Sequence, residues 1–199
     1  MLTSRFEEAI QLASDLHRQQ KRRTTQVPYL AHLMGVSALA LEATAYHEPR
    51  NREDIAIGAL LHDAIEDQGD KITLDDIHNR FGRHVHDIVL GCTDEVPDPN
   101  RVKRTTWRER KERFVAGIGD KHRDVQLVCC ADKLYNSRAI MIDYRKIGDE
   151  IWDRFSAQKT ETLWYYESLA SAFAASWQDN PLLAEFTAEV ASMRRAVNG

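Results

Sequence analysis

Cysteine, proline and glycine are scarce in this sequence of 199 residues, which contains three, five and nine of them. Two of the cysteines are the adjacent Cys129 and Cys130, inside the apolar run VQLVCCA. These positions predict reduced, buried thiols in a cytoplasmic protein, and the spacing excludes a zinc site built from clustered cysteines. The shortage of proline and glycine leaves long segments without helix breakers.

A long apolar run and a basic excess are also missing. No stretch approaches the roughly 20 apolar residues that a membrane span requires, and the first ten residues lack the pattern of a signal peptide. Lysine and arginine number 27 against 31 aspartate and glutamate residues, so the net charge is −4. Because nucleic-acid binding usually brings a basic excess, we expect neither a nucleic-acid nor a membrane partner. Basic residues are clustered at 18–23 and 101–104, so the binding of a small anionic ligand remains possible.

Helical periodicity is what the sequence does contain. Its 43% hydrophobic and 29% charged residues are typical of a soluble globular protein. Apolar residues recur at helical spacing from Phe6 to Leu16, and no alternating pattern indicates strands. Helices are expected over residues 3–18, 28–46, 52–67, 74–81, 84–92, 105–119, 125–144 and 149–178, with a last helix from residue 181. The sequence therefore predicts one all-α domain over residues 1–199, with its motifs in residues 3–140 and C-terminal helices in residues 149–196.

The stretch LLHDAIEDQGD, residues 60–70, places an imidazole and three carboxylates close together. At 100° per residue, His62, Asp63, Glu66 and Asp67 form one continuous stripe on a helix. Carboxylates at a helix C-terminus oppose the macrodipole, so a bound cation would compensate them. We expect His62 and Asp63 to hold a metal ion, with Glu66 and Asp67 one turn further along as acid and base. The alternative is the solvated face of an ordinary amphipathic helix.

A metal ion needs further ligands, and two polar residues beside apolar runs can supply them. His32 lies in PYLAHLMGV and Asp132 in VCCADKLYN. Either residue alone is more often a satisfied polar group of the core. With His62 and Asp63 they form a set of two histidines and two aspartates on three helices, an arrangement that helical bundles use for metals. Nitrogen and oxygen ligands without thiolate suit Mn²⁺, Fe²⁺ or Zn²⁺.

The order of these residues resembles the H…HD…D signature of the HD-domain metal-dependent phosphohydrolases. Longer motifs resemble the hydrolase domain of RelA/SpoT homologues, and are most similar to the stand-alone small alarmone hydrolases of the metazoan-SpoT-homologue type. These motifs are HRQQKRRTTQVPYLAH (17–32), ALLHDAIED (59–67), TLDDIHNRFGRHVHDIVLGCTDE (73–95) and ADKLYNSRAI (131–140). The resemblance covers residues 3–140.

The resemblance implies an all-α HD fold that binds one Mn²⁺ ion and hydrolyses the 3′-pyrophosphate of (p)ppGpp, releasing pyrophosphate and GDP or GTP. The metal ligands that it implies are His32, His62, Asp63 and Asp132. Glu66 and Asp67 match the acidic pair that activates or orients the water. The residues that match nucleotide or phosphate contacts are Arg22, Arg23, Asn136 and, more weakly, Lys111. The implied partner is thus a small-molecule nucleotide.

Three departures from the family pattern concern the segment that precedes the site. Leu33 follows His32 where the family usually has proline, Arg23 replaces a lysine, and TTQV lacks the usual Gly-Glu. The substrate therefore stays open between ppGpp, ppApp, a deoxynucleoside triphosphate and a nucleoside monophosphate. A nucleotide-binding module without turnover is a further alternative, which the intact acidic pair and ligand set disfavour.

Structural roles are expected for the remaining histidines and for the C-terminal aromatic residues. Surface or helix-face positions are predicted for His17, His47, His78, His84, His86 and His122. Core packing is predicted for the aromatic series from Trp152 to Trp177, although Trp152 or Tyr165 could line a nucleotide pocket. Residues 93–101, which include two prolines, are expected to form a surface loop or a lid.

Overall fold

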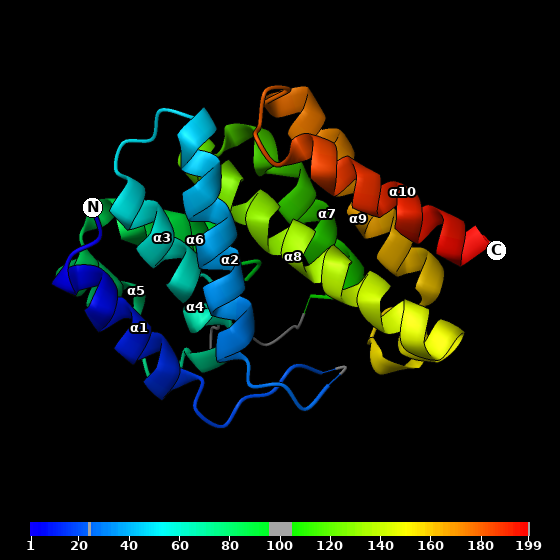
Figure 1. The fold of residues 1–199 in the computed structure, drawn as a ribbon, viewed down its shortest axis with the longest axis horizontal. Coiled ribbons are helices and arrows are strands. Elements are labelled where there is room, and N and C mark those ends of the chain that lie inside the picture. The colour runs from blue at the N-terminus through cyan, green and yellow to red at the C-terminus, as the bar shows by residue number, and fades with distance from the viewer. Residues whose placement is uncertain (24, 96–104, 199) are drawn as a thin grey trace.

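The computed structural model describes residues 1–23, 25–95 and 105–198, and within them regular structure is helical apart from one isolated β-bridge (Figure 1). The α-helices are α1 (Ser4–Leu16), α2 (Leu30–Ala43), α3 (Arg52–Leu61), α4 (Ala64–Gln68), α5 (Leu74–Phe81), α6 (Arg83–Cys92), α7 (Trp107–Ala116), α8 (Arg123–Ile147), α9 (Lys159–Ser176) and α10 (Leu183–Asn198). Short 3₁₀ segments cover Thr44–Tyr46, Ile118–Asp120 and Gly148–Arg154. The predicted all-α class is confirmed.

Polar side chains begin several of these helices by accepting hydrogen bonds from free backbone N–H groups. The Asn51 side chain accepts from Glu53 and Asp54 at the start of α3. Thr73 and Asp76 form a reciprocal capping box at the start of α5, as their spacing predicts. Gly82 ends α5 with φ +87°, a conformation that favours glycine. Local sequence therefore sets these boundaries.

The predicted helix over residues 52–67 is wrong in one respect, because the chain turns at His62 and Asp63. Asp63 has φ −97° and ψ 0°, and it separates α3 from α4. His62 Nδ1 lies 2.8 Å from the carbonyl oxygen of Ala59, which a continuous helix would offer to the N–H of Asp63. The ring thus competes with the backbone at this point. Glu66 and Asp67 consequently lie in the first turn of α4, where the helix dipole favours carboxylates.

Two clusters of buried apolar side chains make up the core. One joins α1, α3, α4, α5 and α6 and receives Leu33 from α2. The other contains Ala131 and joins α8, α9 and α10 to residues of α2, α3, α6 and α7. Figure 1 shows α8 running through the middle of the molecule, with α9 and α10 along one side and α2 and α3 along the other. His32 and Asp132 neighbour residues of different clusters, so they lie where the two clusters meet.

A glycine allows α2 and α8 to approach closely at this junction. A Cβ atom on Gly35 of α2 would overlap the ring of Tyr135 on α8. The same ring lies 5.3 Å from the imidazole of His32, centroid to centroid. Gly35 therefore sets the distance between the helices that carry His32 and Asp132.

Three further predictions can be compared with the structure. Residues 149–178 do not form one helix, because Gly148, at φ +62°, ends α8 and a 3₁₀ segment and an extended stretch precede α9. The surface or helix-face prediction is wrong for His17, whose residue is 2% exposed. Cys92, Cys129 and Cys130 are free and buried, as predicted for the last two.

Parts of two predictions lie outside the described residues. These are residues 96–101 of the expected loop and the basic cluster at residues 101–104. Within the described part of the chain, no helix combines the length and apolar character that crossing a membrane requires.

Candidate metal centre and cavity

Four side chains from three segments meet at one point. His32 comes from α2, His62 and Asp63 from the turn after α3, and Asp132 from the middle of α8. His32 Nε2 lies 3.5 Å from Asp63 Oδ2 and 3.3 Å from Asp132 Oδ1. His62 Nε2 lies 3.0 and 3.4 Å from the same two oxygens. The structure thus brings together the whole set that the sequence singles out.

The histidine nitrogens that face this point are buried and unsatisfied. His32 Nε2 and His62 Nε2 form no hydrogen bond with a described residue. The contact between His62 Nδ1 and the Ala59 carbonyl places the ring proton on Nδ1, so Nε2 presents its lone pair. Buried polar atoms without partners are costly, and a cation would satisfy these two. The donor set therefore fits a divalent metal ion.

Hydrogen bonds from neighbouring side chains hold the two carboxylates in place, two of them at the oxygens that face the histidines. The Tyr29 hydroxyl donates to Asp63 Oδ2 at 2.6 Å. Asn136 Nδ2 donates to Asp132 Oδ1, and Lys133 Nζ donates to Asp132 Oδ2, both at 2.6 Å. Partners of this kind orient metal ligands and tune their basicity. Asp132 is held through both of its oxygens.

The electrostatics of the centre favour a positive charge. Burial opposes protonation of His62, but Asp63 and Asp132 outweigh it and raise the pKa of His62 well above its ordinary value. Burial alone would raise the pKa of both aspartates, yet the surrounding cationic groups lower it well below the ordinary range. For Asp132 the largest of these opposing effects comes from Lys133. The carboxylates thus stay ionised and attract a cation.

Glu66 and Asp67 lie on the rim of this centre. Glu66 is an exposed residue, yet partial loss of hydration, together with the charges of Asp94 and Asp63, raises the pKa of Glu66 to about 7. The pKa of Asp67 is also raised, by burial and by Asp63, against a hydrogen bond from Gln20. A carboxyl group with a pKa near neutrality can both accept and release a proton at physiological pH.

A cavity of about 440 Å³ opens over the acidic rim. The cationic and amide side chains that line it are Arg22, Arg23, Lys21, Lys111, Lys133, Gln20 and Asn136. Its other wall is aromatic and comes from Tyr29, Phe155, Tyr165 and Tyr166. Arg22 donates to Asn136 Oδ1 at 2.9 Å, and Lys111 forms an ion pair with Asp94. Every residue predicted for substrate binding therefore borders this cavity.

Several residues of the site escaped the sequence analysis. Tyr29 lies one helical turn before His32, and Lys133 directly follows Asp132, so both were readable as neighbours of predicted ligands. Lys133 is a half-buried cation that pairs with the Asp132 carboxylate. Tyr165 lines the cavity as foreseen, whereas Trp152 is not among the lining residues.

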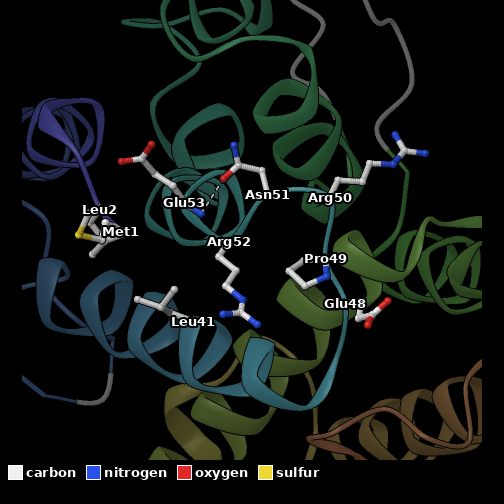
Figure 2. Close-up of a pocket in the computed structure, with 9 residues that line it drawn as sticks. All are labelled: Met1, Leu2, Leu41, Glu48, Pro49, Arg50, Asn51, Arg52 and Glu53. Atoms are coloured by element: carbon white, nitrogen blue, oxygen red, sulfur yellow. Dashed lines mark hydrogen bonds between the residues drawn. The ribbon is translucent and has the colours of Figure 1, made fainter.

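A larger hollow, of about 590 Å³, lies near the N-terminus (Figure 2). It is lined by Met1, Leu2, Leu41 and residues 48–53. Figure 2 shows that the side chains of Glu48 and Glu53 do not converge, and Asn51 is engaged in its capping bond. The groups that could perform chemistry are therefore concentrated at the smaller cavity.

Comparison with known proteins assigns the class. Residues 9–170 match the HD domain family, and the chain belongs to that family. Membership implies dependence on a divalent metal ion, in keeping with the cluster of His32, His62 and Asp63. The resemblance inferred from the motifs is confirmed.

Particular relatives sharpen this class. MESH1 of Drosophila melanogaster, named guanosine-3′,5′-bis(diphosphate) 3′-pyrophosphohydrolase, is 31% identical over 143 residues, or 71% of this chain and 72% of MESH1. The solved structure of a metazoan orthologue of SpoT that hydrolyses ppGpp superposes with a TM-score of 0.72 at 24% identity, covering 98% of this chain and 96% of the other. The structure of lmo0812 from Listeria monocytogenes EGD-e gives 0.68 at 22% identity, over 82% and 99% of the two chains. At these identities both structures establish the fold.

Proposed function

We propose that this chain is a Mn²⁺-dependent cytoplasmic hydrolase, a single domain over residues 1–199, that removes the 3′-pyrophosphate of (p)ppGpp. The observation that carries the proposal is the convergence of two unsatisfied imidazole nitrogens and two carboxylates beneath a cavity rich in cations. The name of the relative MESH1 supplies the substrate class.

The charges of the cavity suit a pyrophosphorylated nucleotide. Arg22, Arg23 and Lys111 line the rim, and Lys133 lies deeper, beside Asp132. Arginine binds phosphate oxygens through two parallel N–H groups, whereas lysine acts as a point charge. Tyr165 and Tyr166 offer aromatic surface to the rest of the nucleotide. We assign phosphate binding to the cationic side chains, and contact with the nucleobase to the aromatic side chains.

The residues present can carry out hydrolysis. Mn²⁺ bound by His32, His62, Asp63 and Asp132 would polarise a phosphoryl oxygen and acidify a water molecule. Glu66, with Asp67 beside it, accepts the proton of the water and returns one to the leaving oxygen. A bond forms between the water oxygen and the phosphorus attached to the ribose 3′ oxygen, and the bond from phosphorus to that oxygen breaks. The products are pyrophosphate and GDP from ppGpp, or GTP from pppGpp.

Product analysis tests the proposal directly. The purified chain is incubated with Mn²⁺ and, separately, ppGpp, pppGpp, ppApp, a deoxynucleoside triphosphate and a nucleoside monophosphate. We expect intact pyrophosphate together with GDP or GTP, and no turnover after chelation of the metal.

Other outcomes would identify the alternatives. A preference for ppApp, or release of inorganic phosphate from the other nucleotides, would mean that the chain is a hydrolase with a different substrate. Tight binding of ppGpp without turnover in Mn²⁺ would instead indicate a binding module.

A further inference from the structure

The side chain of Gln20 contacts Asp67 and links it to His17, the residue at the C-terminal end of α1. Gln20 Nε2 donates to Asp67 Oδ2 at 2.6 Å. On its other side, Gln20 Oε1 lies 2.7 Å from His17 Nδ1 and accepts from Gln68 Nε2 at 2.9 Å. Both ends of the Gln20 amide are therefore engaged, and the side chain has little freedom to rotate.

The direction of this chain of hydrogen bonds follows from its two ends. A carboxylate only accepts hydrogen bonds, so the amide of Gln20 must turn its nitrogen toward Asp67. Its oxygen then faces His17, which must carry its ring proton on Nδ1. Burial lowers the pKa of His17, in keeping with a neutral ring that has one donor nitrogen and one acceptor nitrogen. A reversed amide would bring two oxygens together at Asp67.

His17 is itself fixed by burial and by stacking. The residue is 2% exposed, and its ring stacks on Tyr29 with centroids 5.3 Å apart and planes 25° apart. The Tyr29 hydroxyl in turn donates to Asp63. One buried imidazole thus stands behind both Asp63 and Asp67.

We propose that Gln20 is a positioning residue for Asp67, and that His17 anchors it. The proposal rests on the proposed function, in which Asp67 belongs to the pair that handles the reacting water. The Gln20 amide holds Oδ2 of Asp67, and both residues border the cavity. Gln20 itself borders the cavity, but its amide is engaged by Asp67, His17 and Gln68, so we expect its loss to act on turnover more than on substrate binding.

The first test compares two adjacent glutamines. Gln20→Leu removes the hydrogen bond to Asp67, whereas Gln19→Leu makes the same change at an exposed position. We expect Gln20→Leu to lower kcat by roughly 10- to 100-fold, as loss of an orienting partner does, while KM and Mn²⁺ affinity stay within about twofold. A kcat equal to that of Gln19→Leu, or a parallel loss of Mn²⁺ affinity, would overturn the proposal.

A second variant separates the two ends of the amide. Gln20→Glu retains an acceptor for His17 but replaces the donor to Asp67 by a carboxylate. We expect kcat to fall as in Gln20→Leu, while ¹⁵N NMR continues to show His17 protonated on Nδ1. Wild-type kcat in Gln20→Glu, or a His17 proton on Nε2 in the wild-type protein, would contradict the proposed direction of the chain.

These readouts distinguish this inference from the proposed function. If the wild-type chain turns over none of the nucleotides, the proposed function fails, whereas the tautomer of His17 still tests the hydrogen-bond chain. If the wild-type chain is active and Gln20→Leu matches Gln19→Leu, only the positioning role fails.

Discussion

Asp132 and Asp124 lie on the same helix, α8, about two turns apart, and each meets more than one histidine. At Asp132 the partners are His32 and His62, with nitrogen-to-oxygen distances of 3.3 and 3.4 Å. At Asp124 the partners are His47, His84 and His122, at 2.7, 3.1 and 3.5 Å. The two clusters use the same residue types on the same scaffold.

The two clusters differ in the hydrogen bonds that their ring nitrogens form and in the direction in which these nitrogens point. Asp124 accepts hydrogen bonds from His47 and from the Arg50 backbone, and Nδ1 of His84 lies 3.3 Å from Asp54. His84 Nε2 is buried and forms no hydrogen bond with a described residue, although it lies 3.1 Å from Asp124. At the other cluster the ring nitrogens point with two carboxylate oxygens at one position below a cavity. Convergence of two unsatisfied ring nitrogens and two carboxylate oxygens beneath a cavity, rather than the presence of histidine and aspartate, therefore marks the candidate metal centre.

The largest expected effect comes from breaking the metal cluster. His62→Ala removes a proposed ligand, and since loss of an orienting partner alone costs roughly 10- to 100-fold in affinity or activity, we expect a larger loss of both. Mn²⁺ titration by calorimetry and the nucleotide assay measure it. The matched change in the other cluster, His84→Ala, should leave Mn²⁺ affinity as in the wild type. Equal losses of Mn²⁺ affinity in His62→Ala and His84→Ala would show that the two clusters do not differ in metal binding.

Asp124→Ala should instead affect folding. Its side chain is fully buried, and removing it leaves His47 and His84 without their acceptor. We expect the free energy of unfolding to fall by about 3 kcal/mol, as when one partner of a buried pair is removed. Urea denaturation measures the change, and Mn²⁺ affinity of the folded protein should be unaltered. Unchanged stability would show that this cluster is not structural.

A smaller effect is expected where the cavity meets the substrate. Arg22 lines the cavity and contacts Asn136, whereas Arg18 is an exposed residue that pairs with Asp15. Arg22→Ala should raise KM for ppGpp by about 10-fold, the worth of one charge-assisted contact, with little change in kcat. Arg18→Ala is the control for general charge. Similar KM values in the two variants would remove Arg22 from the substrate site.

The smallest expected effect is a pH dependence of stability at the Asp124 cluster. Burial would raise the pKa of Asp124, but hydrogen bonds from His84 and His47 outweigh it and lower the pKa to about 2 from 3.8. This contribution is complete above pH 3.8 and is lost as the pH falls through about 2. The hydrogen bond to Asp124 raises the pKa of His84, so that contribution is complete below 6.5 and is lost at higher pH.

The stability difference between the wild type and Asp124→Asn should therefore be largest between about pH 4 and 6.5. Urea denaturation of both proteins across this range measures it. A difference that keeps growing above pH 6.5 would contradict the contribution of His84.

Local signals made much of the fold predictable. The spacing of Thr73 and Asp76 predicted a capping box, and Gly82 predicted the end of α5. The turn at Asp63 was not predictable, because it depends on a histidine ring that takes the carbonyl of Ala59. The burial of His17 also escaped, since it depends on Tyr29 and on segments distant in the sequence.

The candidate site was predictable as a set of residues but not as a geometry. The motifs containing His32, His62 and Asp132 gave the set, and the fold brings these residues together. The supporting hydrogen bond from Tyr29 to Asp63 joins residues whose relation appears only when the start of α2 has packed against the turn between α3 and α4. Periodicity describes one helix at a time, so contacts between helices lie beyond it.

Gly35 affects the spacing of the side chains that converge at the candidate metal centre. It touches no ligand atom, yet the ring of Tyr135 lies where its side chain would be, and this fixes how far α2 stands from α8. His32 and Asp132 ride on those two helices. A single methyl group, in Gly35→Ala, would overlap the Tyr135 ring, so either this ring or the two helices would have to shift. The spacing of His32 and Asp132 thus depends partly on a residue that has no side chain and lies outside the proposed ligand set.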